Sequence, residues 1–256
     1  MFDPVLLADW AKGEWRDSIP RCPVTGFSID TRTLKEGDLF IALKTDERDG
    51  HEFLGNAAEA GAVGAVVNRR VVGVGIPQLV TDDPMRALQE IAREHRRLFT
   101  SPIVGVTGSC GKTSSKDIIA LLLGGPEEVL STHANLNNAL GVPLTLLELD
   151  PGKHQVGVIE AGISLVGEME LLGSLIHPDV TVVTMIGSAH LDGLKSLETV
   201  AKEKLVLALS GKPNGLVVFP YECFKFAAFR SLRMPILSVA REGFERIEGR
   251  SPDCVY

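Results

Sequence analysis

The sequence predicts an α/β protein in which a small N-terminal α/β domain precedes a larger domain with a mostly parallel sheet. Short apolar runs rich in β-branched residues alternate with stretches of helical periodicity, which is typical of parallel strands joined by helices. A glycine-rich loop at residues 108–113 stands between an expected strand and an expected helix, as phosphate-binding loops do. We expect the first domain to span residues 1–98, including a linker helix, and the second to span residues 99–256.

The expected elements of the first domain are two strands and two helices. Residues 39–43 and 62–67 are apolar runs that predict strands, and residues 52–60 have helical spacing. Gly61 follows that helix, at a position where glycine commonly ends a helix because it tolerates positive φ. Residues 84–99 place apolar side chains at helical spacing after a proline in the first turn, so we expect a helix that links the two domains.

The second domain is expected to begin with a strand at residues 103–107 and a helix at residues 116–123, whose apolar residues lie nearly all round it. Another helix is expected to begin near Ser196. The stretch after Arg230 carries little structural signal and no obvious closing element. Apolar, β-branched runs predict three further strands at residues 157–162, 180–186 and 215–220.

The composition indicates a soluble globular protein and excludes several classes. Hydrophobic residues make up 45% of the 256 residues, and the net charge of -7 argues against broad electrostatic capture of nucleic acid. No run of about 18 apolar residues predicts a membrane span, and the acidic N-terminus differs from a signal peptide, so we predict a cytoplasmic protein. The cysteines are too far apart for a zinc site and are expected to be free thiols: Cys22, Cys110, Cys223 and Cys254.

The loop Gly108-Ser109-Cys110-Gly111-Lys112-Thr113 is the most informative motif of the chain. Its backbone N–H groups and the N-terminus of the following helix can bind phosphate oxygens. Lys112 is expected to reach the outer phosphates, and the Thr113 hydroxyl is expected to bind Mg²⁺. Val106 stands where the full pattern has glycine. The loop predicts ATP or another nucleotide as ligand but no reaction, because kinases, ATPases, GTPases and ligases share it. A P-loop kinase is the weaker interpretation, since no second acidic magnesium motif is evident.

Polar residues beyond the loop are further candidates for a site, and most have an ordinary structural alternative. Glu160 follows an apolar strand at the sheet edge where α/β ligand sites gather, so its carboxylate is a candidate Mg²⁺ ligand. His190 follows a strand and is equally compatible with packing. Lys202 and Lys204 lie on an expected helix and, by periodicity alone, are solvated. Three neighbouring amides fit either a polar ligand or a loop: Asn135, Asn137 and Asn138.

Taken in this order, the motifs resemble the Mur ligase family. GVTGSCGKT is similar to the family's phosphate loop, which also accepts the valine. THANLNNALGVPLTLL, VIEAG and the stretch from IGSAHLDG to VAKEK follow with similar spacing. SIDTRTLKEGDLFIALKTDERDGHEF is similar to the family's UDP-sugar domain. The likeness runs from about Ser28 to Leu209. It is greatest to the members that join D-alanyl-D-alanine to UDP-MurNAc-tripeptide, and it implies a UDP-MurNAc-binding first domain and an ATP-binding central domain.

The resemblance implies two Mg²⁺ sites and a modified lysine. In the family, the loop threonine and the glutamate after the next strand bind one Mg²⁺, which corresponds to Thr113 and Glu160 here. The histidine, here His190, helps to hold a second Mg²⁺ beside a lysine that CO₂ carbamylates. The spacing from His190 favours Lys204 for this role, with Lys202 as the alternative. Burial would favour the neutral amine that this reaction needs.

The resemblance also implies substrate contacts and a two-step reaction. Asp30, Thr31 and Arg32 match the motif near the uracil and diphosphate, and the planar Arg32 guanidinium suits the diphosphate. ATP would phosphorylate the terminal carboxylate of UDP-MurNAc-tripeptide, and the amine of D-alanyl-D-alanine would then attack the acyl phosphate, with Lys112, His190 and Lys204 in catalytic roles. Further implied substrate residues are Lys44, Asp49, His51, Asn135, Asn137 and Asn138.

The resemblance covers part of a family member, because members add a third domain that binds the incoming amino acid and closes over ATP. We therefore expect a partial central domain, no C-terminal domain and no independent activity, with a separate chain as one source of the missing part. The alternatives are a Mur ligase that adds a different amino acid and a non-catalytic nucleotide- or UDP-sugar-binding remnant. The retained set argues against long decay: Lys112, Thr113, Glu160, His190 and Lys204.

Overall fold

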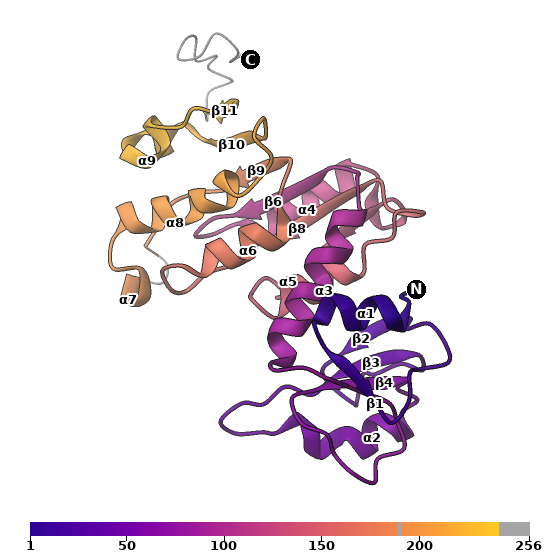
Figure 1. Ribbon diagram of the computed structural model, residues 1–256. Helices are drawn as coiled ribbons and strands as arrows, with labels where there is room; N and C mark the ends of the chain where they lie inside the picture. The colour runs from indigo at the N-terminus through magenta and orange to yellow at the C-terminus, as the bar shows by residue number, and fades with distance from the viewer. Residues whose placement is uncertain (189–190, 241–256) are drawn as a thin grey trace. The chain divides into compact units, whose positions relative to one another are not determined.

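The computed structural model describes residues 1–188 and 191–240, with the side chains of residues 191 and 192 left out. The chain divides into two compact units, Met1–His95 and Arg96–Tyr256. Helix α3 (Pro84–Leu98) contains the division, so the last turn of the helix belongs to the second unit (Figure 1). Each unit has its own sheet, and each is described by itself below.

The first unit is built on a five-stranded sheet with the order β1-β5-β4-β3-β2. Its strands are β1 (Glu14–Arg16), β2 (Gly26–Ser28), β3 (Asp38–Ile41), β4 (Gly64–Val67) and β5 (Gln78–Val80). Strands β2 to β5 are parallel to their neighbours, and β1 pairs with β5 in the antiparallel direction. The central strands β3 and β4 are buried along their whole length, as expected for apolar strands covered on both faces.

Helices cover this sheet, and one of them, α2, ends where the sequence predicts. They are α1 (Pro4–Ala11), the 3₁₀ turn η1 (Gly50–Phe53) and α2 (Leu54–Glu59). Leu54 and Ala57 of α2 pack with Phe40 and Val67 of the sheet to form the core of the unit. Gly61 has φ +91° directly after α2, so glycine fits this turn better than any residue with a Cβ.

The second unit is built on a six-stranded sheet in the order β11-β10-β9-β6-β8-β7, with every neighbouring pair parallel. Its strands are β6 (Ile103–Thr107), β7 (Val129–Ser131), β8 (Val156–Glu160), β9 (Val180–Val183), β10 (Leu216–Pro220) and β11 (Ile236–Val239). Its helices are α4 (Lys112–Leu122), η2 (Gly125–Glu127), α5 (Gly141–Leu147), α6 (Glu168–Ile176), α7 (Leu191–Leu194), α8 (Leu197–Leu209), η3 (Tyr221–Lys225) and α9 (Ala227–Arg230).

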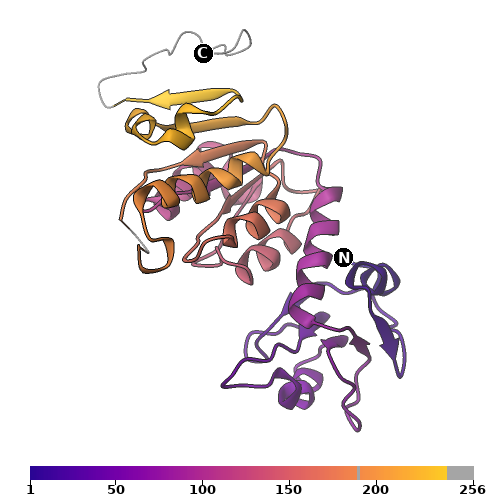
Figure 2. The same ribbon diagram turned by 60° about the vertical axis from the view of Figure 1, so that its left-hand side comes forward.

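Alternation along β6 shows that helices cover both faces of this sheet. Val104 and Val106 pack with Ala120 of α4, whereas a Cβ at Gly105 would point at Leu207 of α8. Because successive side chains of a strand point to opposite faces, α4 and α8 lie on opposite faces. Helix α6 runs beside α8 on the same face (Figure 2).

The predicted α/β class and its main elements are confirmed. The helices expected at 52–60, at 84–99 and from Ser196 correspond to α2, α3 and α8, and Ser196 is the N-cap of α8. No described helix is long and apolar enough to cross a membrane. The strands expected at 39–43, 62–67, 103–107, 157–162, 180–186 and 215–220 correspond to β3, β4, β6, β8, β9 and β10.

Two expectations for the second domain were wrong. The helix predicted at 116–123 begins earlier, at Lys112, because the phosphate loop passes directly into the helix through the left-handed residue Gly111. The stretch after Arg230 does contain an element that extends the sheet, since β11 pairs in parallel with β10. Cys22, Cys110 and Cys223 are free thiols as predicted, and Cys254 lies outside the described residues.

Candidate functional site

The phosphate loop joins the buried end of β6 to the first turn of α4. Gly108 has φ +152° and Gly111 has φ +78°. A Cβ at Gly108 would come within 1.8 Å of Thr184 Oγ1, which directly follows β9. A larger residue at this position would therefore push the loop away from Thr184. No side chain caps the N-terminus of α4. Its first N–H groups are therefore free to bind an anion, where the helix dipole also favours negative charge.

Hydrogen bonds from the segment after β9 fix the conformation of the loop. Ser109 N donates to Met185 O at 2.9 Å, and Ser109 Oγ donates to Gly187 O at 3.0 Å and accepts from Gly187 N at 2.9 Å. Thr184 Oγ1 donates to Cys110 O at 2.5 Å. Lys112 Nζ donates to Gly108 O at 3.1 Å, so this amine lies over the loop. The loop is thus held in shape before any ligand binds.

Glu160 is the acidic residue that the structure brings to this loop. It ends β8, the neighbour of β6, and is 1% exposed. Its Oε2 accepts from Thr113 Oγ1 at 2.9 Å and its Oε1 accepts from Asn137 Nδ2 at 2.7 Å. Within the described part of the chain, no cationic side chain forms an ion pair with this carboxylate. A buried carboxylate beside a hydroxyl and a phosphate-binding loop suits Mg²⁺, which prefers oxygen ligands and keeps several waters.

The structure separates the three predicted amide residues. Only Asn137 reaches the site, through its bond to Glu160. Asn138 Oδ1 accepts from Leu140 N at 3.1 Å and from Gly141 N at 2.9 Å, which fixes the turn into α5. Asn135 is exposed and forms no described side-chain hydrogen bond. The predicted contacts of these residues with a substrate stay predictions.

The structure distinguishes the two candidate lysines of α8. Lys204 is 2% exposed, whereas Lys202 lies on the solvent side of the helix. Burial, together with the nearby positive charge of Lys112, lowers the pKa of Lys204 to about 8. Lys204 is therefore the lysine whose amine is readily neutral. His190 lies outside the described residues, so its predicted role is not placed. No cluster of three or more His, Cys, Asp or Glu side chains occurs among the residues that are described.

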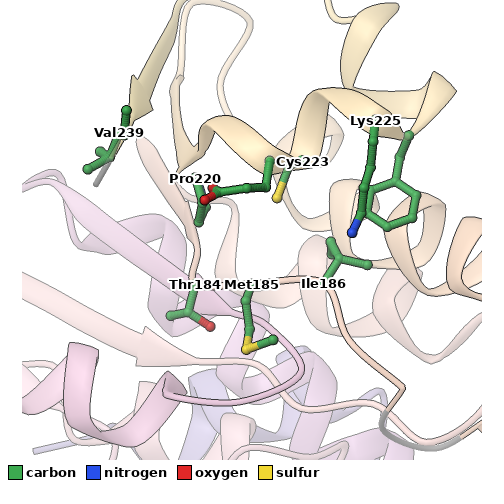
Figure 3. A pocket seen from close by; sticks show the side chains of 10 residues that line it. Thr184, Met185, Ile186, Pro220, Cys223, Lys225 and Val239 are labelled. Carbon is green, nitrogen blue, oxygen red and sulfur yellow. The ribbon is translucent and has the colours of Figure 1, made fainter. Parts of the chain in front are cut away.

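A cavity of about 490 Å³ lies at the carboxyl ends of β9, β10 and β11, next to the phosphate loop. Figure 3 shows Thr184, Met185 and Ile186 across from the residues that follow β10. Burial raises the pKa of the Cys223 thiol to about 11, so this lining residue is inert at neutral pH. The other lining residues are Pro220, Glu222, Lys225, Phe226, Val239 and Ala240. Sequence reasoning missed this cavity because it missed β11, although the aromatic-rich stretch 219–229 was the available signal.

The DTR residues of the first unit form a local turn. Arg32 Nε donates to Asp30 Oδ1 at 2.9 Å, and its Nη2 donates to Asp30 Oδ2 at 2.5 Å. The Arg32 guanidinium lowers the pKa of the Asp30 carboxyl to about 2. The Arg32 side chain is 82% exposed, so this pair can open at little cost when a stronger anion arrives. Thr31 lies between them and is half-buried.

The second predicted element of the first unit is a hydrogen-bonded network around Asp49 and the buried His51. His51 Nδ1 lies 2.6 Å from Asp49 Oδ1, and His51 Nε2 accepts from Asn68 N at 3.2 Å. Arg69 donates to the other Asp49 oxygen at 2.8 Å and, as the main cause, holds the pKa of Asp49 well below its usual range. Both ring nitrogens of His51 are therefore used within the protein. Lys44 is exposed on the strand-like bridge opposite Asp49.

Each of the two units matches a model of a known protein domain family. Residues 106–242 match the Mur ligase middle domain, and residues 23–96 match the catalytic domain of the Mur ligase family. The first match alone covers more than half of the chain.

The chain belongs to the Mur ligase family. Among its curated relatives, the UDP-N-acetylmuramoyl-tripeptide–D-alanyl-D-alanine ligase of Synechocystis is 39% identical over 197 residues, and the enzyme of that name from Escherichia coli is 40% identical over 192 residues. These matches cover 76% and 75% of this chain but 43% and 42% of the relatives. The family predicted from the motifs is therefore confirmed, and the chain spans less than half the length of these Mur ligases.

Solved structures of Mur ligases have the same fold as this chain. MurF from Acinetobacter baumannii superposes with a TM-score of 0.84 at 30% identity, over 94% of this chain and 53% of that one. MurF from Thermotoga maritima, solved in complex with ADP, gives a TM-score of 0.75 at 30% identity, over 86% of this chain and 51% of that one.

Proposed function

We propose that this chain supplies the ATP-binding and UDP-sugar-binding parts of a ligase that joins D-alanyl-D-alanine to UDP-MurNAc-tripeptide. The observation that carries the proposal is the buried Glu160 carboxylate, which accepts a hydrogen bond from the phosphate-loop hydroxyl of Thr113 and has no cationic side-chain partner in the described residues. Such a carboxylate suits a metal-bound nucleotide. The names of the curated relatives and the ADP bound to the Thermotoga maritima structure support the choice of reaction and nucleotide.

In this proposal, ATP binds with its phosphates in the loop at residues 108–113. The backbone N–H groups at the start of α4 and the amine of Lys112 bind the outer phosphates. Thr113 and Glu160 hold one Mg²⁺, which supplies positive charge against the transferring phosphoryl group. The cavity between β9 and β11 takes the nucleotide base, because it opens beside Thr184, whose hydroxyl touches the loop.

The buried Lys204 is the proposed site of carbamylation. Its lowered pKa leaves much of the amine neutral at mildly alkaline pH, and only the neutral amine attacks CO₂. The amine loses a proton and gains a carboxylate, so a cation becomes an oxygen ligand. Together with His190, this group would hold the second Mg²⁺.

The first domain, proposed at residues 1–98, binds the UDP-MurNAc part of the acceptor. Arg32 has an exposed, planar guanidinium that can exchange Asp30 for a diphosphate. The neighbouring network of Asp49 and His51 holds the adjacent segment in shape. The terminal carboxylate of the tripeptide then takes the γ-phosphoryl group from ATP in the second domain, and ADP is the leaving group. The amine of D-alanyl-D-alanine attacks the acyl phosphate, and the peptide bond forms as phosphate leaves. The proposed location of this reaction is the cytoplasm.

Binding of the acceptor tests this proposal directly. We expect the purified chain to bind UDP-MurNAc-tripeptide saturably at one site, measured by isothermal titration calorimetry. UDP should compete for this site, whereas ADP with Mg²⁺ should not, because the two ligands use different domains. The variant Arg32→Ala should weaken acceptor binding by about tenfold, the value of one charge-assisted hydrogen bond. No binding of UDP-MurNAc-tripeptide, or competition by ADP with Mg²⁺, would contradict the assignment.

A further inference from the structure

Lys116 is a buried lysine to which the proposed reaction gives no role. It lies on α4 one turn after Lys112 and is 4% exposed. Burying an ammonium group costs free energy unless the group is paired and hydrogen-bonded, so a buried lysine requires specific partners. It is four positions after Lys112, and this spacing places it close to the phosphate loop on the same helix.

The Lys116 ammonium connects α4 to the end of edge strand β7 by a hydrogen bond. Its Nζ donates to Thr132 O at 2.6 Å, and Thr132 is fully buried directly after β7. A second contact, 2.7 Å to Asp117 Oδ1, involves a carboxylate whose side chain is 61% exposed. An ion pair so open to water stabilises little. The bond to Thr132 is therefore the contact with a structural consequence.

Thr132 is in turn hydrogen-bonded to the backbone of Glu160, the residue whose carboxylate is the proposed magnesium ligand. Its Oγ1 accepts from Glu160 N at 2.8 Å. The segment that begins at Thr132 continues to Asn137, whose Nδ2 donates to Glu160 Oε1 at 2.7 Å and whose carbonyl accepts from Gly162 N at 2.8 Å. Segment 132–137 is thus hydrogen-bonded to both the backbone and the side chain of Glu160. The Lys116 ammonium hydrogen-bonds the same segment to α4, the helix that follows the phosphate loop.

We propose that Lys116 is a positioning residue that orients Glu160 for magnesium through the segment 132–137. The inference rests on the proposed binding of a magnesium nucleotide. Edge strand β7 is three residues long and has a neighbour on one side only. Without the ammonium, the segment would lose its hydrogen bond to α4, and only the apolar packing of β7 on that helix would remain. Oε1 and Oε2 of Glu160 would then no longer face Asn137 and Thr113 together.

The test compares ADP affinity with and without Mg²⁺, measured by isothermal titration calorimetry. In Lys116→Met, which keeps the length of the side chain, we expect ADP affinity without Mg²⁺ to stay within about twofold of the unchanged chain. The factor by which Mg²⁺ increases the affinity for ADP should fall about tenfold, which corresponds to the free energy of one charge-assisted hydrogen bond. Thr132→Val removes the hydrogen bond from Glu160 N to the Thr132 hydroxyl, and it should reduce the effect of Mg²⁺ on ADP affinity by the same factor. The double variant should lose no more than either single variant, because the residues act in series.

Asp117→Asn is the matched control, since it removes the exposed partner and keeps the bond to Thr132. It should leave the magnesium effect unchanged, and a loss as large as that of Lys116→Met would overturn the proposal. If Lys116→Met lowers the melting temperature but keeps the full magnesium effect, Lys116 only stabilises the fold and the proposal is wrong. If Lys116→Met does not fold, the magnesium effect in Thr132→Val decides. Failure of the unchanged chain to bind ADP would instead overturn the proposed function, and this inference with it.

Discussion

Replacing Glu160 with glutamine is expected to weaken the binding of ADP in the presence of Mg²⁺ by about 100-fold. The amide has nearly the same shape as the carboxylate, so its oxygen can still accept from Asn137 while its NH₂ group donates to the Thr113 hydroxyl. What is lost is the negative charge of a residue that is itself 1% exposed, where solvent screens the charge weakly. This change in affinity corresponds to a loss of about 2.8 kcal/mol of binding free energy.

The measurement is calorimetric titration with ADP at saturating Mg²⁺ and again in EDTA. ADP affinity in EDTA should not fall in Glu160→Gln, because the removed charge repels phosphate. Glu170→Gln is the matched control: this carboxylate is exposed in the first turn of α6, and its loss should leave both affinities unchanged. An unchanged magnesium effect in Glu160→Gln would show that the metal binds elsewhere.

Replacing Lys204 with arginine is expected to abolish the carbamate that forms in the presence of bicarbonate. Arginine stays protonated and cannot react with CO₂, whereas the pKa of Lys204 is lowered from 10.5 to about 8. The carbamate should be visible by carbon NMR with labelled bicarbonate, and its amount should increase as the pH rises through about 8. Lys202→Arg should retain the signal, because Lys202 is exposed. A signal that persists in Lys204→Arg, or that disappears in Lys202→Arg, would contradict the assignment.

The same lowered pKa predicts how stability changes with pH. In the folded chain Lys204 binds its proton less tightly than in the unfolded chain. Protonation therefore favours the unfolded state, and the destabilisation is fully present below pH 8. The contribution of Lys204 should raise the free energy of unfolding between about pH 8 and 10.5, and Lys204→Met should remove this dependence. Urea titrations at several pH values measure it.

The sequence predicted the elements whose residues are buried on both faces. Strands β6 and β8 are continuous apolar runs, and hydrophobic pattern alone finds such runs. The first turn of α4 was missed because its residues serve the phosphate loop and carry no apolar periodicity. Strand β7 is three residues long and β11 contains a single buried residue, so neither has the continuous buried apolar run that marks β6 and β8.

The candidate site was predictable in its residue types but only partly in its contacts. The adjacency of Thr113 and Glu160 follows from the pairing of β6 with β8, which the strand sequences do not specify. Asn137 and Asn138 are neighbours with the same side chain, and only the loop conformation decides that one meets Glu160 while the other caps a turn. Periodicity alone did not separate Lys202 from Lys204, because buried residues lie on most sides of α8, and only the family resemblance favoured Lys204.

The most direct test of the account is a titration of the unchanged chain with ADP, in Mg²⁺ and then in EDTA. The account predicts one saturable site per chain and tighter binding with Mg²⁺ than without, because the phosphate loop binds the nucleotide and Thr113 and Glu160 bind the metal. Absence of ADP binding in both conditions, or affinity that is the same with and without Mg²⁺, would contradict it.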